Sequence, residues 1–341
     1  MPERRRKCTG NRESLSRFEN GFTRGSCYNF FMEQLKILAG TYTDSGSEGI
    51  YSFVFENGVL SAPELFAKID SPKYISVENG LVASIGKFEN GAGAAVFDAS
   101  GTLLASAAFE TKTSCFITWH DGALYTANYH EGTFSKLVYE DGDLRLEKTV
   151  SIKDHAGCHQ VLFHNDMILV PCLFLDRIML FDLNMDYCGS IMFPDGTGPR
   201  HGVFSNDGST LYIASELSNE LFVLDTDGWK LRGVTPVLTD GRTHLRGGAA
   251  VRLSDDEKYI YVSTRGQDLI SVIDTEKLSV LQETYSGGKY PRDFILAGNA
   301  LLSANRYSDT VVSFARSENG AIGPELSRIN IPQAVSLAVM K

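Results

Sequence analysis

Residues that could bind an anion and move a proton recur at two positions of a repeating pattern. One position directly follows a turn residue and holds Lys73, Cys115, His159, Arg200, Ala249, Arg292 and Gln333. The other lies at the end of a short apolar strand and holds Tyr42, Gly86 with Lys87, Asn128 with Tyr129, Leu173, Glu216, Arg265, and Asn305 with Arg306. Arginine presents a planar fork that suits phosphate or carboxylate. His beside Glu can transfer a proton near neutral pH. The pattern therefore predicts acid–base chemistry on an anionic ligand.

The elements that position these residues belong to a sevenfold repeat. Its turn residues follow one another at intervals of 41–49 residues: Pro72, Ser114, Cys158, Pro199, Gly248, Pro291 and Pro332. After each turn come a short apolar run, a second apolar strand, and a hairpin across Asn-Gly, Asp-Gly or a similar pair. A period of about 40–45 residues with four strands per unit indicates a β-propeller. We predict an all-β, seven-bladed propeller with four antiparallel strands per blade.

The two ends of the repeat predict how the ring closes. The first unit begins at KILAGTYT, which matches a second strand, and the last segment, PQAVSLAVMK, matches a first strand with nothing after it. The C-terminal strand should therefore complete the first blade, which leaves no open sheet edge. Deleting residues from Ala334 onward should badly destabilise the fold.

Blade topology predicts which side chains meet. In a four-stranded antiparallel blade, the start of the innermost strand and the end of the second strand face the same mouth of the channel. We therefore expect one mouth to collect His159, Glu216, Arg200, Arg265, Arg292 and Arg306. An alternative for Arg292 and Arg306 is that they tie neighbouring blades by hydrogen bonds. His201, next to Arg200, is expected to point the other way and to be structural.

Composition narrows the function classes. The formal net charge of −10 argues against nonspecific binding to nucleic acid or anionic membranes. The sequence contains no run of 18 apolar residues, so we expect no membrane span. Six cysteines without C-x-x-C spacing favour free thiols in a reducing, cytoplasmic compartment. Residues 1–31 are polar and basic, and we expect a disordered extension before a single domain over residues 32–341, with Met32 as a candidate natural start.

Several catalytic motifs are missing from the sequence. It contains no H-E-x-x-H, no G-x-S-x-G and no phosphate-loop pattern. A zinc protease and a serine-nucleophile hydrolase are therefore disfavoured. We expect no metal and no cofactor, and a monomer or weak homodimer.

Four segments carry a resemblance to a known family: GCHQVLFHNDMILVPCLFLDRIMLFDL, GPRHGVFSNDGSTLYIASELSNELFVLD, VRLSDDEKYIYVSTRGQDLISVIDTEKL and GGKYPRDFILAGNALLSANRYSDTVVSFAR. They resemble the bacterial seven-bladed propeller lactonases, which include propeller-type 6-phosphogluconolactonases and are similar to carboxymuconate lactonising enzymes. The resemblance runs from about Lys36 to Lys341. The chain departs from the family at Gln160, Ser215 and Thr264, beside the main site residues.

The resemblance implies a catalytic set of His159, Arg200, Glu216 and Arg265. It also implies hydrolysis of a small anionic sugar lactone, 6-phospho-D-glucono-1,5-lactone, in the pentose phosphate pathway. Either His159 or Glu216 would be the general base. The residues expected to bind substrate are Lys73, Asn128, Tyr129, Arg292 and Arg306. Two alternatives remain open: another lactonase or a lactonising enzyme acting on a carboxylate, and a non-catalytic propeller that binds a protein.

Overall fold

Tight turns with positive φ angles divide the chain into short strands. At Asp141 and Gly142 both φ angles are positive, at 53° and 80°. Two residues of this kind suit a hairpin, because their twist matches that of the flanking strands. The pair joins β11 (Thr133–Glu140) to β12 (Asp143–Ser151) in one antiparallel ladder. Local sequence thus sets where strands turn back on themselves.

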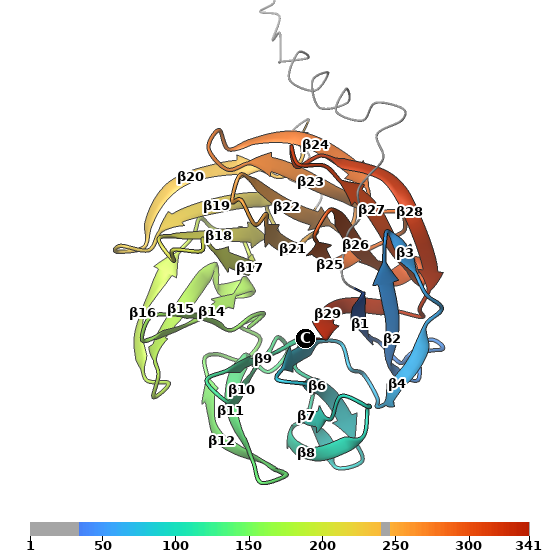
Figure 1. Cartoon of the computed structure of the whole chain (residues 1–341). Helices are drawn as coiled ribbons and strands as arrows, with labels where there is room; N and C mark the ends of the chain where they lie inside the picture. Colours follow the sequence, from blue (N-terminus) through green and yellow to red (C-terminus); the bar gives the residue numbers. More distant parts are fainter. Residues whose placement is uncertain (1–33, 240–245, 341) are drawn as a thin grey trace, which may run out of the picture.

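The computed structural model describes residues 34–239 and 246–340, which form seven antiparallel sheets around a central axis (Figure 1). Each sheet is one blade, with strands running from the axis to the rim. Blade two contains β5 (Ile75–Glu78), β6 (Leu81–Phe88), β7 (Gly91–Phe97) and β8 (Leu103–Glu110). Blade three contains β9 (Phe116–His120), β10 (Ala123–Asn128), β11 and β12. Blade four contains β13 (Leu162–His164), β14 (Met167–Cys172), β15 (Arg177–Asp182) and β16 (Tyr187–Met192). A short 3-10 helix, η1 (Leu173–Leu175), follows β14.

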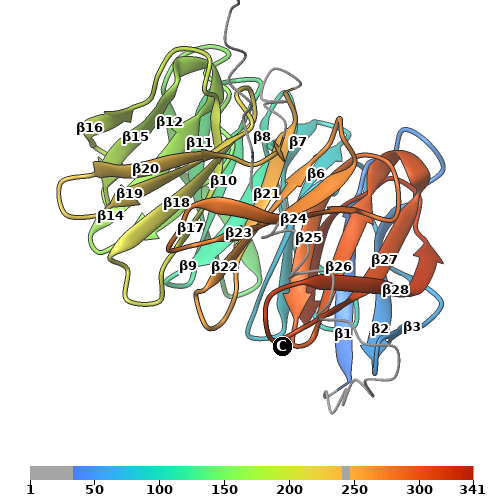
Figure 2. The same ribbon diagram turned by 90° about the horizontal axis from the view of Figure 1, so that it is seen from above.

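Blades five to seven repeat the same order. Blade five contains β17 (Pro199–Phe204), β18 (Thr210–Ser215), β19 (Glu220–Asp225) and β20 (Lys230–Pro236). Blade six contains β21 (Gly248–Leu253), β22 (Tyr259–Thr264), β23 (Leu269–Asp274) and β24 (Ser279–Tyr285). Blade seven contains β25 (Pro291–Ala297), β26 (Ala300–Asn305), β27 (Thr310–Arg316) and β28 (Ile322–Asn330). A second 3-10 helix, η3 (Arg306–Ser308), follows β26. The inner strands β17, β21 and β25 contact one another in turn, and Figure 2 shows the ring turned by 90° from the view of Figure 1.

The first blade joins the two ends of the described chain. Its innermost strand is the C-terminal β29 (Ala334–Met340), which pairs with β1 (Leu35–Thr41), and β1 pairs with β2 (Gly49–Glu56). The outer strand is split into β3 (Val59–Leu60) and β4 (Glu64–Lys68), which both pair with β2. The predicted seven-bladed architecture, with a C-terminal strand closing the first blade, is confirmed.

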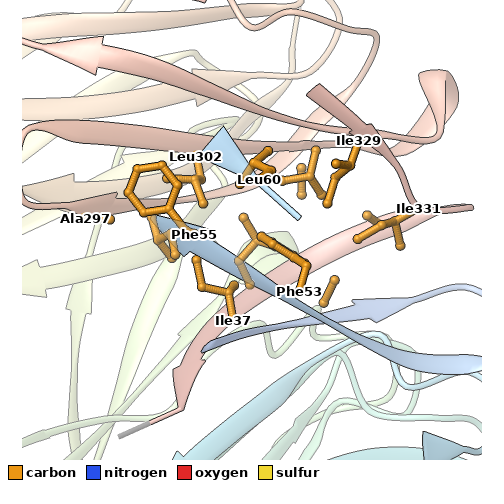
Figure 3. Close-up of a cluster of buried hydrophobic side chains, with 14 of the residues drawn as sticks. Ile37, Phe53, Phe55, Leu60, Ala297, Leu302, Ile329 and Ile331 are labelled. Atoms are coloured by element: carbon orange, nitrogen blue, oxygen red, sulfur yellow. The ribbon is translucent and has the colours of Figure 1, made fainter. Parts of the chain in front are cut away.

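Apolar side chains fill the space between neighbouring blades. Each apolar cluster combines residues of two adjacent blades. At the junction where the ring closes, Ile37, Phe53 and Phe55 of the first blade pack against Leu302 and Ile329 of the seventh (Figure 3). Burying these side chains stabilises the contact between the blades, so blade-to-blade packing holds the rigid frame of the central mouth.

Three further expectations concern the N-terminal extension, the cysteines and membrane spans. The expected extension over residues 1–31 lies outside the described residues. Cys115, Cys158 and Cys172 are buried free thiols, and Cys188 is an exposed one. No helix in the described part of the chain is long and apolar enough to cross a membrane.

Candidate active site

One mouth of the central channel contains a cavity of about 260 Å³. Its walls come from residues just before inner strands and just after second strands, which the blade topology brings to one end of the ring. The residues that line it are Tyr42, Lys73, Cys115, Tyr129, His130, His159, Glu216, Arg265, Tyr290 and Arg292. Positive charge predominates in this set, so the cavity suits an anionic ligand.

A carboxylate held by two guanidinium groups forms one wall. Oε2 of Glu216 accepts a hydrogen bond from Nε of Arg200 at 2.9 Å and lies 2.7 Å from Nη2 of Arg265. Arg200 also donates from Nη1 to the carbonyl of Ala249 at 2.7 Å. Burial opposes ionisation of Glu216, but Arg265 and Arg200 outweigh it and hold its pKa below the usual value. Glu216 is therefore an ionised carboxylate whose position is fixed by two arginines.

Arg200 itself is buried behind this wall. Only 1% of its surface is exposed, and it does not line the cavity. Burial, together with the nearby charge of Arg265, lowers its pKa to about 10. Arg200 therefore acts on the cavity through Glu216.

β-Bulges bring two arginines to the mouth. In β17 the pairing register shifts between Pro199 and His201, which leaves Arg200 as an extra residue. The register shifts around Arg292 at the start of β25 in the same way. Because an extra residue interrupts the regular alternation of side chains, bulges often redirect a side chain beside an active site.

His159 and His201 form a buried pair next to the carboxylate. Nδ1 of His159 lies 3.1 Å from Nε2 of His201, so one ring donates a hydrogen bond to the other. Burial lowers both pKa values well below the usual value, and Arg200 adds to the effect. Both rings are therefore neutral at neutral pH. His201 does not line the cavity, and its ring packs edge-on against Tyr74 and Phe116; its contact with His159 was not predicted from the sequence.

Cations surround an aromatic ring, Tyr42, in another part of the cavity lining. Nζ of Lys73 and the guanidinium carbon of Arg292 each lie 5.6 Å from the centre of the Tyr42 ring. Lys73 donates one hydrogen bond, to the carbonyl of Thr113 at 3.2 Å, and burial lowers its pKa although Tyr42 opposes this. Within the described residues, neither Lys73 nor Arg292 has a carboxylate partner within ion-pair distance. Both cations are thus available to an anion in the cavity.

Two residues predicted to bind substrate do not line the cavity. Arg306 stacks on the outer side of the site, with its guanidinium carbon 3.7 Å from the centre of the Tyr42 ring, and donates to Gln333 at 2.9 Å. The Asn128 amide donates to the carbonyl of Lys112 at 2.7 Å and accepts from the backbone of the next turn. Arg306 therefore supports Tyr42, and Asn128 shapes the turn that carries Tyr129.

The structure brings the other predicted residues together and adds some that sequence reasoning missed. Lys73, Tyr129, His159, Glu216, Arg265 and Arg292 line the same cavity. The additional lining residues, which sequence reasoning did not assign to the site, are Tyr42, Cys115, His130 and Tyr290. Tyr42 and Cys115 occupy the two recurring positions, so that pattern could have identified them. The hydroxyl of Tyr290 lies 3.3 Å from Nη1 of Arg265, and its only sequence signal is its place directly before the turn residue Pro291.

Comparisons with known proteins agree with this geometry. The profile of the family described as "Lactonase, 7-bladed beta-propeller" matches residues 36–339. A protein named 6-phosphogluconolactonase from Bacillus subtilis (strain 168) is 31% identical over 336 residues, covering 87% of this chain and 95% of its own. A solved structure from Lactobacillus plantarum superimposes with a TM-score of 0.84 at 25% identity, covering 91% and 100% of the two chains. The periplasmic gluconolactonase of Pseudomonas aeruginosa shares the fold, with a TM-score of 0.81 at 23% identity, and the match covers 91% and 99%.

Proposed function

From the fact that this chain belongs to the family of seven-bladed β-propeller lactonases, we propose that it hydrolyses 6-phospho-D-glucono-1,5-lactone to 6-phosphogluconate, a step of the pentose phosphate pathway. Its named relatives support a lactonase function. The observation that carries the choice of a phosphorylated lactone is the pair of cations, Lys73 and Arg292, which line the same cavity as Glu216 and His159 and have no carboxylate within ion-pair distance among the described residues.

In the proposed mechanism, His159 is the general base. Opening the lactone requires a water molecule to lose a proton as it attacks the carbonyl carbon. A neutral imidazole can take that proton, whereas Oε2 of the Glu216 carboxylate is already occupied by Arg200 and Arg265. Binding an anionic substrate adds negative charge to a cationic cavity, which favours the imidazolium that forms. Glu216, whose Oε2 is occupied by the two arginines, orients substrate hydroxyls with its other oxygen.

Arg265 is the group we propose for the oxyanion. It lines the cavity, and its guanidinium also contacts Glu216 and Tyr290, which fix its orientation. A positioned donor of this kind is typically worth about 10²–10³ in turnover. Arg200 holds Glu216, which in turn contacts Arg265, so we assign Arg200 a positioning role.

Lys73 and Arg292 are the groups we propose for the phosphate. Replacing Arg292 with Gln removes the charge and keeps much of the side-chain length. We expect KM for 6-phosphogluconolactone to rise about tenfold or more, while KM for unphosphorylated glucono-1,5-lactone changes little. Steady-state kinetics on both lactones measures this, with spontaneous opening subtracted.

The same assay separates the alternatives. An equal rise in KM for both lactones would contradict the phosphate assignment. Activity only on a carboxylate-bearing lactone, or lactone formation from an unsaturated diacid, would favour the lactonising alternative. No turnover of any lactone, with no thermal stabilisation by 6-phosphogluconate or a diacid, would favour a non-catalytic binding protein.

A further inference from the structure

Tyr42 lines the cavity and has a well-supported ring. The residue directly follows β1, and its ring lies against the guanidinium of Arg306, which Gln333 holds by a hydrogen bond. Among the residues that the structure describes, none forms a hydrogen bond with the Tyr42 hydroxyl. That hydroxyl is the polar group of Tyr42 that is free to meet a bound substrate.

The surroundings of Tyr42 favour loss of its proton. Burial raises the pKa of a phenol, but Arg292, Lys73 and Arg306 outweigh burial and lower the pKa of Tyr42 below its usual value, while Cys115 acts weakly in the opposite direction. Arg292 and Arg306 belong to the seventh blade, Lys73 lies just before β5 of the second blade, and Cys115 just before β9 of the third. A phenolate formed here would be stabilised by three cations.

The chemistry of the proposed substrate requires a proton donor at this place. Opening the lactone releases its ring oxygen, which is bonded to C5, and the phosphate is carried on the neighbouring C6. A group that protonates the ring oxygen must therefore lie beside the phosphate subsite. Tyr42 is flanked by Lys73 and Arg292, the two cations assigned to the phosphate.

We propose that Tyr42 is a further catalytic residue, the general acid that protonates the departing ring oxygen; this inference rests on the proposed function. Water attacks the carbonyl carbon, so that a new C–O bond forms, and the water gives one proton to His159. The bond between C1 and the ring oxygen then breaks, its electron pair goes to the oxygen, and the Tyr42 proton is transferred there. The phenolate recovers a proton from the His159 imidazolium through solvent, so that one water is consumed.

Tyr42→Phe tests this role because it removes only the hydroxyl and keeps the ring on Arg306. General acid catalysis typically contributes about 10²–10⁴-fold, so we expect kcat for 6-phosphogluconolactone to fall by about 10²-fold or more. The affinity for 6-phosphogluconate, measured by isothermal titration calorimetry, should stay within about threefold of wild type. Tyr285→Phe, on the exposed outer strand β24, is the matched control and should behave as wild type in both assays. Melting curves of both variants show whether each remains folded.

Each outcome of this experiment is decisive. A kcat for Tyr42→Phe close to that of wild type would overturn the inference. A loss confined to KM, with an equal loss of affinity for 6-phosphogluconate, would also overturn it and would make Tyr42 a binding residue. If wild type itself hydrolyses no lactone, the proposed function fails and this inference with it; an active wild type with an equally active Tyr42→Phe variant overturns the inference alone.

Discussion

At the level of single residues, the site is defined by side chains whose charge states depend on burial. Glu216 remains ionised because two arginines contact one of its oxygens, and His159 remains neutral because it is buried among cations. Perturbed ionisable groups that share a cavity are a feature of catalytic sites. The same residues leave Lys73 and Arg292 free to bind an anion.

The low pKa of His159 predicts an unusual pH dependence. A free histidine becomes protonated as the pH falls through about 6.5 and would then stop acting as a base. Because the pKa of His159 is well below that value, it stays unprotonated through this range, and kcat/KM, which reports the free enzyme, should hold until the pH falls through the depressed pKa. The phosphate monoester of the substrate itself titrates at about pH 6, so its pKa must be measured separately, for example by phosphorus NMR. An acid limb centred on the ordinary histidine pKa would contradict the assignment of His159 as base.

Sequence reasoning identified much of the site at this level and missed part of it for a physical reason. His159, Glu216 and Arg265 could be predicted because their repeat positions determine which mouth they face. The contact of His201 with His159 could not, because it depends on how two neighbouring blades pack together. Tyr290 precedes a turn residue, and nothing in the sequence shows that it reaches Arg265.

At the level of elements, inner strands with bulges at their starts carry the arginines, and they need ties to their neighbours. Asp293 in β25 provides one: its Oδ1 accepts from Nη2 of Arg252 at 2.6 Å, and its Oδ2 accepts from the backbone N–H of Leu337 in β29 at 3.0 Å. The carboxylate is 2% exposed. It therefore links three neighbouring inner strands below the cavity.

Asp293→Ala should be strongly destabilising. It leaves the Arg252 guanidinium without its carboxylate and the Leu337 N–H without an acceptor. Removing one partner of a buried ion pair typically costs about 3–5 kcal/mol. Glu325→Ala is the matched control, because it breaks the partly exposed pair with Arg328 and should cost about 1 kcal/mol or less. Urea denaturation of the two variants compares these costs, and equal midpoints would show that Asp293 does not tie the strands.

At the level of the whole molecule, closure of the ring is the property that keeps the mouth in shape. Both the blade count and the closing strand could be predicted from the sequence, since the repeat period and the hairpin turns are local signals and the first unit visibly lacks one strand. The split of the first outer strand into β3 and β4 was not predicted, because its hairpin matches the pattern of the other blades.

Removing β29 by ending the chain at Gln333 tests closure. The change exposes β1 and opens the apolar cluster shared by the first and seventh blades. We expect loss of cooperative thermal unfolding and exposure of apolar surface, seen by circular dichroism and dye binding. Leu337→Ala, which removes one buried side chain from the same strand, should lower stability by about 2–5 kcal/mol and keep a cooperative transition. A truncated protein that melts like wild type would show that the ring does not depend on its last strand.

The most direct test of the account is the rate of opening of freshly generated 6-phosphogluconolactone with wild type, His159→Ala and Glu216→Gln, corrected for spontaneous hydrolysis. We predict that wild type clearly accelerates opening of the lactone and that the corrected rate falls by about 10²-fold or more in each folded variant. Absence of acceleration by wild type, or variants as active as wild type, would contradict it.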